Sequence, residues 1–556
     1  MPRLSFENKS EHMILKRYIE DHIGNRFDLI IIGGGITGAA VAYSAAASGL
    51  SVALFEKKDY GSATSAATSK LIHGGLRYLA NLEFRLVRES LRERRILGNI
   101  APNLVYPVPF ILPNYKRRKG NNWKILLGMV LYDLLSYDKK DTWDKSKRLP
   151  NHKIISHSQT TILEPNVKKE NLLNAAFFYD YQSISPERLT LAFIKSAAEY
   201  GAQVSNYASV EAVKFDADNK ITGVEVLDIF SGKKKDFYTN LIINCGGPWA
   251  DNILNQAAKR NLPVYRIKRS EGIHIITRKI AGDHVVSLQT KDGRHMMIMP
   301  WRGHSLIGTT DKEFSGNPDD YKVSKESLYE VVKSVNENFG IKISPSDIMY
   351  AYGGLRSLVD GQTKDSYKAS RKYKVHDNAI DGIEGMITVE GGKYTTSRNL
   401  ATEVVKLVSK KLKRPLSDSV TKNGYLSGCK IKDMKQFMIT QHLNYADFNR
   451  QTIEYVSRNY GTDSNVVFKI ARDNPRFAEV ISHDGEILAE IVFALKYENA
   501  KTLTDIMLRR TGIGTLGNPG KDIIEKIAHI AAEMLNWDQK RIEEENASVM
   551  RLYELY

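Results

Sequence analysis

The sequence is poor in cysteine, with only Cys245 and Cys429 among 556 residues. Two thiols cannot build a disulfide framework, a cysteine-based zinc site or an iron–sulfur cluster, and their scarcity fits a reducing compartment. Proline is also sparse at 16 residues, and glycine has no fixed period, which excludes collagen-like and proline-rich low-complexity classes. No metal site is predicted.

Long hydrophobic runs are missing as well. Residues 1–26 contain no apolar run of the length that a signal peptide requires. Glycines divide the longest uncharged stretch, residues 29–55, into segments too short to span a bilayer, so no transmembrane helix is expected. We expect residues 1–26 to form an N-terminal arm packed on the body. The apolar face of this arm is also compatible with a helix that binds a membrane surface. That face contains Ile14, Tyr18, Ile19 and Ile23.

Acidic residues are outnumbered by basic ones, 64 to 80, which gives a formal charge of +16. This excess suggests an anionic partner, which could be a nucleic acid, a membrane surface or a phosphorylated substrate. No helix-turn-helix signal, zinc ligands or interleaved basic and aromatic motif supports a nucleic acid. The basic run 116–119 leads into the apolar segment 123–135, a pattern typical of an interfacial helix on anionic lipid. A buried helix behind a solvated loop explains the same pattern.

A glycine-rich turn lies in a complete βαβ context near the N-terminus. Residues 27–32 read as a buried parallel strand, residues 37–48 as an alanine-rich helix, and residues 51–55 as a second strand. Between them, Gly33, Gly35 and Gly38 satisfy G-x-G-x-x-G, and Glu56 follows the second strand as an acceptor for a ribose hydroxyl. The motif predicts dinucleotide binding and disfavours NADP, but it does not separate FAD from NAD.

Other strand ends carry the same combination of glycines and hydroxyl groups. Residues 62–69 are dense in serine and threonine, and residues 241–249 and 386–396 each read as a buried strand followed by glycines. These strand ends are far apart in the sequence, so a single cofactor that contacts all of them would have to be long.

In their order along the chain, these stretches resemble the FAD-dependent glycerol-3-phosphate dehydrogenase family, within the D-amino-acid-oxidase-like flavoproteins. The resemblance runs from about residue 27 to the C-terminus. It is carried by residues 31–38, 68–79, 307–311, 353–356 and 391–396.

The resemblance implies an α/β fold with two interleaved domains over residues 27–430: a Rossmann-like FAD-binding domain and an antiparallel-sheet substrate domain. Residues 431–556 are expected to form a C-terminal all-helical domain. Apolar residues at three- and four-residue spacing predict helices over 433–443, 485–497, 503–510 and 522–537.

The family pattern also implies roles for individual residues. His274 is the predicted general base, and Arg356 is expected to hydrogen-bond the reacting oxygen. Residues that bind the substrate and its phosphate are Arg77, Tyr78, Arg371 and Lys393. Residues that contact the cofactor are Gly33, Gly35, Gly38, Glu56, Thr64, Ser65, Ser69, Lys70, Leu71, His73, Gly391, Gly392 and Thr395. His73 is expected beside the flavin, as a wall or as a proton carrier.

The resemblance implies oxidation of sn-glycerol 3-phosphate to dihydroxyacetone phosphate, with FAD as hydride acceptor and a membrane quinone as final acceptor. The enzyme would be cytoplasmic and peripheral on the inner face of the cell membrane, with a homodimer as a possible assembly. A soluble oxidase that reduces oxygen is the alternative. An amino-acid oxidase is disfavoured because one carboxylate does not require Arg77, Arg371 and Lys393 together.

Overall fold

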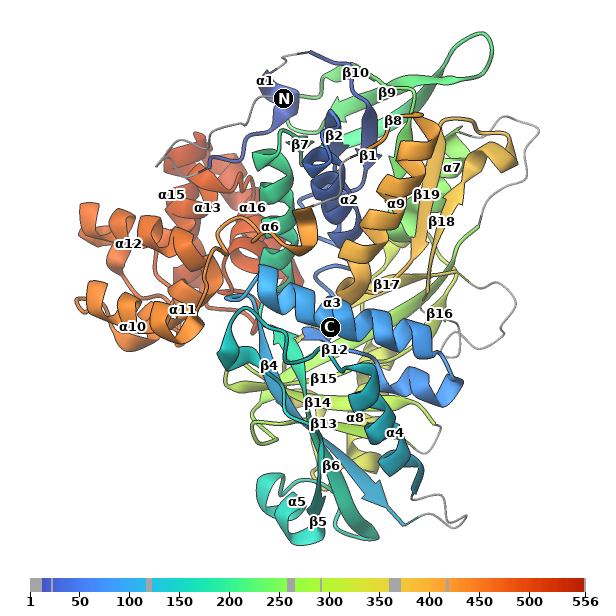
Figure 1. Cartoon of the computed structure of the whole chain (residues 1–556). Helices are drawn as coiled ribbons and strands as arrows, with labels where there is room; N and C mark the ends of the chain where they lie inside the picture. The colour runs from blue at the N-terminus through green and yellow to red at the C-terminus, as the bar shows by residue number, and fades with distance from the viewer. Residues whose placement is uncertain are drawn as a thin grey trace.

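The computed structural model describes residues 13–21, 24–116, 123–257, 266–290, 293–359, 372–416 and 420–554. These residues form two principal sheets and a group of helices near the C-terminus, which occupies one side of the molecule (Figure 1). The mixed α/β architecture with a C-terminal helical part agrees with the predicted fold class.

The first sheet has the strand order β18-β19-β11-β1-β2-β7 in the described part of the chain. All neighbouring pairs are parallel except β18 and β19. Its strands are β1 (Leu29–Ile32), β2 (Val52–Phe55), β7 (Gln203–Ser205), β11 (Ile242–Asn244), β18 (Tyr373–Asp377) and β19 (Met386–Gly391). Strand β1 is apolar and buried at every position, as expected where both faces of a parallel sheet are covered.

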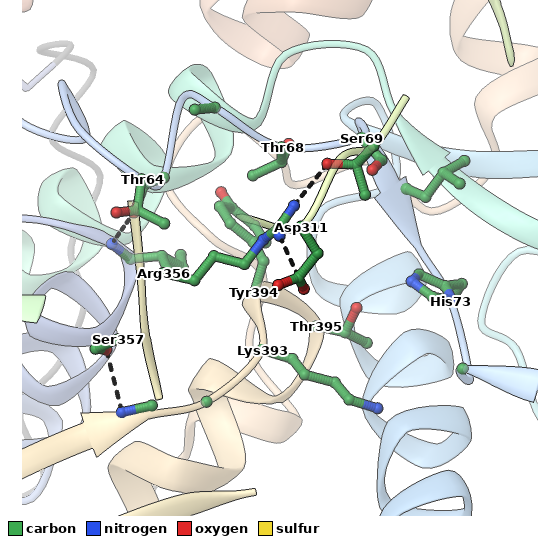
Figure 2. Close-up of a pocket in the computed structure, with 18 of the residues that line it drawn as sticks. Thr64, Thr68, Ser69, His73, Asp311, Arg356, Ser357, Lys393, Tyr394 and Thr395 are labelled. Atoms are coloured by element: carbon green, nitrogen blue, oxygen red, sulfur yellow. Dashed lines mark hydrogen bonds and ion pairs between the residues drawn. The ribbon is translucent and has the colours of Figure 1, made fainter. Parts of the chain in front are cut away.

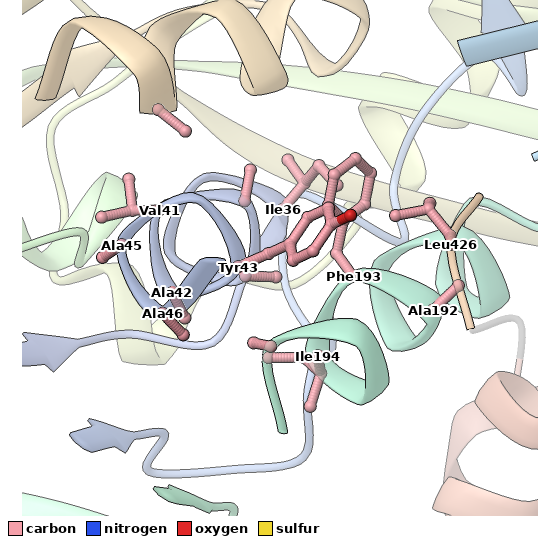
Figure 3. Close-up of a cluster of buried hydrophobic side chains, with 14 of the residues drawn as sticks. Ile36, Val41, Ala42, Tyr43, Ala45, Ala46, Ala192, Phe193, Ile194 and Leu426 are labelled. Carbon is pink, nitrogen blue, oxygen red and sulfur yellow. The ribbon is translucent and has the colours of Figure 1, made fainter. Parts of the chain in front are cut away.

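Helix α2 (Ile36–Ala47) packs against α6 (Pro186–Glu199) and α9 (Ser397–Lys411). Alanine has the highest helix propensity, and its small side chain lets neighbouring helices approach closely. Figure 3 shows Tyr43 of α2 beside Phe193 of α6, and their ring centroids are 6.1 Å apart in an edge-to-face arrangement. The predicted alanine-rich helix is therefore confirmed as a central element of the core.

The second sheet is largely antiparallel, and its longest pairings join β4 to β6 and β12 to β17. Its strands are β3 (Leu71–Ile72), β4 (Val105–Tyr115), β5 (Lys153–Ser156), β6 (Leu172–Ser183), β12 (Lys268–Arg278), β13 (Val285–Gln289), β14 (His295–Trp301), β15 (His304–Gly308), β16 (Lys312–Phe314) and β17 (Ile348–Leu358). These segments alternate along the chain with those of the first sheet, so the expected interleaving is confirmed. A small antiparallel sheet also contains β8 (Ala208–Phe215), β9 (Ile221–Asp228) and β10 (Lys234–Tyr238).

Further helices cover these sheets or project from them. They are α3 (Phe84–Ile100), α4 (Trp123–Leu135), α5 (His157–Leu163), α7 (Ala250–Ala257) and α8 (Lys325–Asn338). In the described part of the chain, no helix combines the length and the apolar character needed to cross a bilayer.

The C-terminal part is helical, as the apolar spacing predicted. Its helices are α10 (Met434–Asn444), α11 (Arg450–Tyr460), α12 (Ser464–Asp473), α13 (Ala489–Tyr497), α14 (Leu503–Asp505), α15 (Lys521–Leu535) and α16 (Gln539–Tyr553). A π-helical turn, Ile506–Arg510, continues α14. The sequence analysis placed α10, α13, α14 and α15 but assigned no helix to α11, α12 or α16.

The described part of the arm, residues 13–21 and 24–26, includes the short helix α1 (Tyr18–Asp21). Tyr18 and Ile19 are buried, and the Arg17 guanidinium pairs with Asp228 Oδ1 at 2.6 Å. This part of the arm packs on the body of the protein as expected, whereas residues 1–12 and 22–23 lie outside the described residues.

The buried carboxyl of Glu490 on α13 makes the C-terminal helices sensitive to pH. Burial, followed by the Glu486 charge, raises the pKa of Glu490 from 4.5 to about 8. The folded state therefore holds a proton that the unfolded state releases, and the Glu490 contribution to stability falls as pH rises from about 4.5 to 8. We expect Glu490→Gln to gain stability relative to the parent chain as pH rises from 6 to 9, measured by thermal unfolding. Glu544→Gln, at a side chain that is 55% exposed and faces Lys540, should show no such trend.

Candidate active site

A cavity of about 1290 Å³ opens where the two sheets meet (Figure 2). The glycine-rich ends of β1, β11 and β19 contribute Gly33, Gly246 and Gly391 to its wall. These strands are parallel neighbours, so their carboxyl ends lie at one edge of the sheet. The three strand ends thus lie on the wall of one cavity, and their contact with a single cofactor stays a prediction.

The glycine-rich turn is shaped by close backbone approaches. Gly33 has φ of +106°, and a Cβ there would lie 2.6 Å from the carbonyl oxygen of Cys245. A Cβ on Gly38 would lie 1.9 Å from the Gly33 oxygen, so helix α2 can pack against this turn only with glycine at residue 38. Gly35 lines the cavity and precedes α2, whose N-terminal amides favour an anion such as a pyrophosphate.

Glu56 follows β2 and lines the cavity beside this turn. Its Oε2 accepts the Gly34 N–H at 2.7 Å, and its Oε1 accepts the Lys58 N–H at 2.8 Å. Burial raises the pKa of Glu56, and the two amide hydrogen bonds oppose that rise. The turn thus fixes the orientation of this carboxylate, which stays the predicted ribose acceptor.

The hydroxyl-rich loop, residues 62–69, connects the two domains by a hydrogen bond. Thr64 Oγ1 donates to the Leu355 carbonyl at 2.6 Å, across the boundary between the two sheets. Ser65 Oγ accepts the Ile36 N–H at 2.9 Å, at the first residue of α2. Thr64, Ser65, Ser69, Leu71 and His73 all line the cavity.

Lys70 differs from its neighbours in this loop. Its ammonium group pairs with Glu187 Oε1 at 2.6 Å, and its side chain is 3% exposed and absent from the cavity wall. A buried ammonium needs a paired anion, and Glu187 supplies it. The structure therefore does not bring the Lys70 side chain to the predicted cofactor site.

A cationic cluster forms another part of the cavity wall. The Arg77 Nη2 donates to Tyr78 Oη at 3.0 Å, and Lys393 Nζ lies 3.9 Å from the centre of the Tyr78 ring. Lys393 also donates to Ser90 Oγ at 3.0 Å. The structure thus brings together three of the four predicted substrate-binding residues, and the fourth, Arg371, lies outside the described residues.

His73 lies beside this cluster, on the side toward which Lys393 extends (Figure 2). Burial lowers the pKa of His73 to about 4, with Lys393, Arg77 and Arg94 adding to the effect and Asp180 opposing it. His73 is therefore neutral at pH 7 and able to accept a proton.

Arg356 projects from β17 into the same cavity. Its Nη2 donates to Thr309 Oγ1 at 2.6 Å, and its Nη1 donates to the Thr310 carbonyl at 3.1 Å and lies 3.4 Å from Asp311 Oδ2. A Cβ on Gly272 of β12 would lie 1.9 Å from Arg356 Nη2, so the guanidinium requires glycine beneath it. These contacts fix the guanidinium at the cavity, and its hydrogen bond to the reacting oxygen stays a prediction.

His274 on β12 is 1% exposed, and its Nε2 is 2.8 Å from Ser69 Oγ. Burial lowers the pKa of His274 well below 6.5, and the Arg356 and Lys70 cations lower it further. The ordinary pKa that favoured His274 as the base therefore does not apply here. Its imidazole is neutral and lines the cavity, and its role as the base stays a prediction.

The last glycine pair has a left-handed backbone conformation, which residues with a side chain adopt only with strain. Gly391 and Gly392 have φ of +66° and +98°, and the Gly391 N–H donates to Ser357 Oγ at 3.3 Å (Figure 2). Both glycines and Thr395 line the cavity just before α9. The pair lets the chain reverse from β19 toward Lys393.

Comparison with protein families agrees with this geometry. The model of the "FAD dependent oxidoreductase" family matches residues 28–395, and that of the "C-terminal domain of alpha-glycerophosphate oxidase" matches residues 419–542. A glycerol-3-phosphate dehydrogenase of Synechocystis is 33% identical over 93% of this chain and 95% of its own length. An aerobic glycerol-3-phosphate dehydrogenase of Staphylococcus epidermidis is 30% identical over 96% of both chains.

The chain belongs to the FAD-dependent glycerol-3-phosphate dehydrogenase family.

Solved structures support the fold of this family member. The FAD complex of a Bacillus halodurans glycerol-3-phosphate dehydrogenase has a TM-score of 0.76 at 23% identity, over 97% of this chain and 96% of that one. An FAD-bound L-alpha-glycerophosphate oxidase from Mycoplasma pneumoniae has a TM-score of 0.53 at 16% identity, over 72% of this chain and 98% of that one.

FAD is the cofactor of the family, and the residues present here fit it. The Gly33–Gly38 turn and the α2 N-terminus suit its pyrophosphate, and Glu56 suits the ribose. The cavity continues past the Thr64–Ser69 loop to Gly391 and Gly392, which allows one extended ligand to contact all these predicted residues.

Two sets of site residues were missed by the sequence analysis. Thr309 and Asp311 position Arg356, and although their segment carried the family resemblance, no role had been assigned to them. Asp180 of β6 lines the cavity, and Tyr132 of α4 bonds to it. No local pattern marks this second pair because pairing of β6 with β3 and β4 and packing of α4 bring it to the site.

Proposed function

We propose that this chain oxidises sn-glycerol 3-phosphate to dihydroxyacetone phosphate, with FAD as the hydride acceptor. The observation that carries the proposal is the Arg77, Tyr78 and Lys393 cluster, which shares one cavity with Arg356 and with the FAD-binding turn. A phosphate dianion requires more than one fixed cation, and Arg77 and Lys393 supply two from different segments of the chain.

The reaction requires the secondary alcohol to lose a proton from oxygen and a hydride from carbon. Arg77 and Lys393 bind the phosphate, which places the alcohol carbon at a fixed distance from them. Arg356, oriented by Asp311 and Thr309, donates to the reacting oxygen and stabilises the negative charge that develops there. FAD supplies an electrophilic ring that takes up the hydride.

The proton of the alcohol requires an acceptor inside the cavity. Both His73 and His274 are neutral at pH 7 and line the cavity, so either can accept it in principle. We keep His274 as the proposed base, and loss of the acidic limb of the pH–rate profile in His274→Ala, but not in His73→Ala, would support it. The reverse result would assign the base to His73.

We further propose that electrons pass to a membrane quinone and that α4 docks the enzyme on anionic lipid at the inner face of the cell membrane. Trp123, Leu127 and Leu134 of α4 are 56%, 56% and 65% exposed. Lys124 lies on the same helix and Lys116 is the last described residue before it. Trp123, Leu127 and Leu131 also line the cavity, so an acceptor dissolved in lipid would have an apolar route to it.

Anaerobic visible spectroscopy of the purified protein tests the reaction. We expect a flavin absorbance band that bleaches on addition of glycerol 3-phosphate and does not bleach with glycerol or an amino acid. Equal bleaching by glycerol would contradict a phosphate-binding site. Reoxidation of the bleached enzyme by a short-chain quinone analogue, faster than by air, would support quinone as acceptor, and the opposite order would identify an oxidase.

Replacing Val130 and Leu134 together by glutamate is expected to reduce membrane binding by at least tenfold, since both side chains are exposed and neither lines the cavity. The change puts two charges on the exposed apolar face and leaves the buried Met129 and Tyr132 in place. Co-sedimentation with anionic phospholipid vesicles measures the effect, and flavin bleaching by glycerol 3-phosphate should persist. Leu443→Glu on α10, at a side chain that is 75% exposed, is the matched control and should bind like the parent chain. Unchanged binding of the double variant would refute docking through α4.

A further inference from the structure

A buried polar network lies beside the proposed phosphate site and joins three separate elements. Arg94 of α3, Tyr132 of α4 and Asp180 of β6 are each 2% exposed. Tyr132 Oη donates to Asp180 Oδ2 at 2.7 Å, and Arg94 Nη1 pairs with Asp180 Oδ1. Asp180 lines the cavity, whereas Tyr132 lies behind it.

The network ends on the backbone of Gly74, whose N–H donates to Tyr132 Oη at 3.0 Å. Gly74 follows His73 and precedes Gly75, which has φ of +75° and begins the turn that carries Arg77 and Tyr78. A Cβ on Gly74 would lie 2.4 Å from Tyr132 Oη. The chain that leads into the cationic cluster therefore packs directly on the Tyr132 hydroxyl and on Leu91, whose Cδ2 would also lie 2.4 Å from that Cβ.

The charges around the network explain why a tyrosine serves here. Burial and the Asp180 charge raise the pKa of Tyr132 well above 10, so its hydroxyl keeps its proton and donates it to Asp180. The hydroxyl oxygen is then available to accept from Gly74. Asp180 also provides a negative charge close to Arg94 and His73, and its effect on His73 opposes that of Lys393, Arg77 and Arg94.

We propose that Tyr132 is a positioning residue for the substrate phosphate. Its hydroxyl accepts a hydrogen bond from the Gly74 amide and donates one to Asp180, and it thereby holds residues 73–78 so that Arg77 and Tyr78 face Lys393. Tyr132 does not contact the substrate. The proposal rests on the proposed function, since it concerns the phosphate of that substrate.

The test is Tyr132→Phe in the FAD-loaded enzyme. The phenyl ring keeps its place against Phe178, whose centroid is 5.9 Å from that of Tyr132, while the Gly74 amide and Asp180 lose their shared partner. We expect the KM for glycerol 3-phosphate and the Kd for inorganic phosphate to rise about tenfold each, with kcat changed less than threefold. KM comes from steady-state kinetics, and Kd comes from calorimetric titration.

Tyr181→Phe is the matched control. Tyr181 is the next residue of β6 after Asp180, is 1% exposed, and donates its hydroxyl to the Lys147 carbonyl at 2.8 Å, outside the cavity. It should lower the unfolding temperature about as much as Tyr132→Phe but leave KM and the phosphate Kd unchanged.

Equal KM and Kd values in Tyr132→Phe and Tyr181→Phe would overturn the positioning role while leaving the proposed function intact. A parent enzyme that neither binds phosphate nor is reduced by glycerol 3-phosphate would overturn both.

Discussion

Arg356→Met is expected to lower kcat for glycerol 3-phosphate by about 10²- to 10³-fold, as loss of one preorganised oxyanion donor does in other enzymes. The guanidinium is held by Thr309, the Thr310 carbonyl and Asp311, so its position does not have to be acquired during the reaction. Methionine fills similar space and cannot donate. Steady-state kinetics and the rate of anaerobic flavin bleaching measure the loss.

The control for this prediction is Arg278→Met. Arg278 lies at the end of β12, the strand that pairs with β17, and its side chain is 77% exposed. It should retain parental kcat and KM. A rise in KM for Arg356→Met at an unchanged kcat would show that Arg356 binds the ground state and not the developing oxyanion.

Asp59→Ala is expected to destabilise the folded protein by about 3–5 kcal/mol, because it removes the buried carboxylate that pairs with Arg510 and shares Arg509 with Asp505. Asp59 is 0% exposed; its Oδ2 accepts from Arg509 Nε and Arg510 Nη1, both at 2.7 Å, and its Oδ1 accepts from Arg510 Nη2 at 2.9 Å. Burial alone would raise the pKa of Asp59, but Arg510 and Arg509 hold it well below its usual range. The carboxylate is therefore ionised at every pH at which the enzyme would be assayed.

This ion cluster connects the cofactor domain to the C-terminal helices. Asp59 comes three residues after Glu56, and both arginines lie in the π-helical turn that continues α14. We expect Asp59→Ala to release FAD at a lower temperature than the parent chain, as measured by flavin fluorescence during heating. Asp473→Ala, at a surface carboxylate that is 62% exposed, should shift stability by less than about 1 kcal/mol. An equal effect of both substitutions would contradict the cluster's structural role.

Local patterns predicted those features that depend on short stretches of sequence. The turn at Gly33–Gly38 needs a particular backbone path, and only glycine satisfies it, so its motif is visible in the sequence. Helix α15 was placed because it buries one face, with Ile524, Ile527, Ala528, Ile530 and Ala531, which imposes a helical period on apolar residues.

Helix α4 shows what such patterns do not predict, namely which side of a helix is buried. Its sequence was compatible with an interfacial helix or with a buried one, because its apolar residues extend around most of its circumference. Packing against α3, β6 and the turn at Leu76–Asn81 decides which side chains are covered. Met129 and Tyr132 are buried, and Leu127 and Leu134 are left exposed.

By itself, the sequence determined the dinucleotide turn and the helical character of the C-terminal part, because close backbone approaches and buried faces constrain residue type locally. The interleaved α/β fold and the predicted site residues came from the resemblance to the family. The tertiary structure alone decided that Lys70 pairs with Glu187 away from the cavity, that burial and nearby cations keep His274 neutral, and that Tyr132 bonds to Gly74 and Asp180. Each of these depends on burial and on charges from distant segments, which the fold brings within a few ångströms and no local spacing encodes.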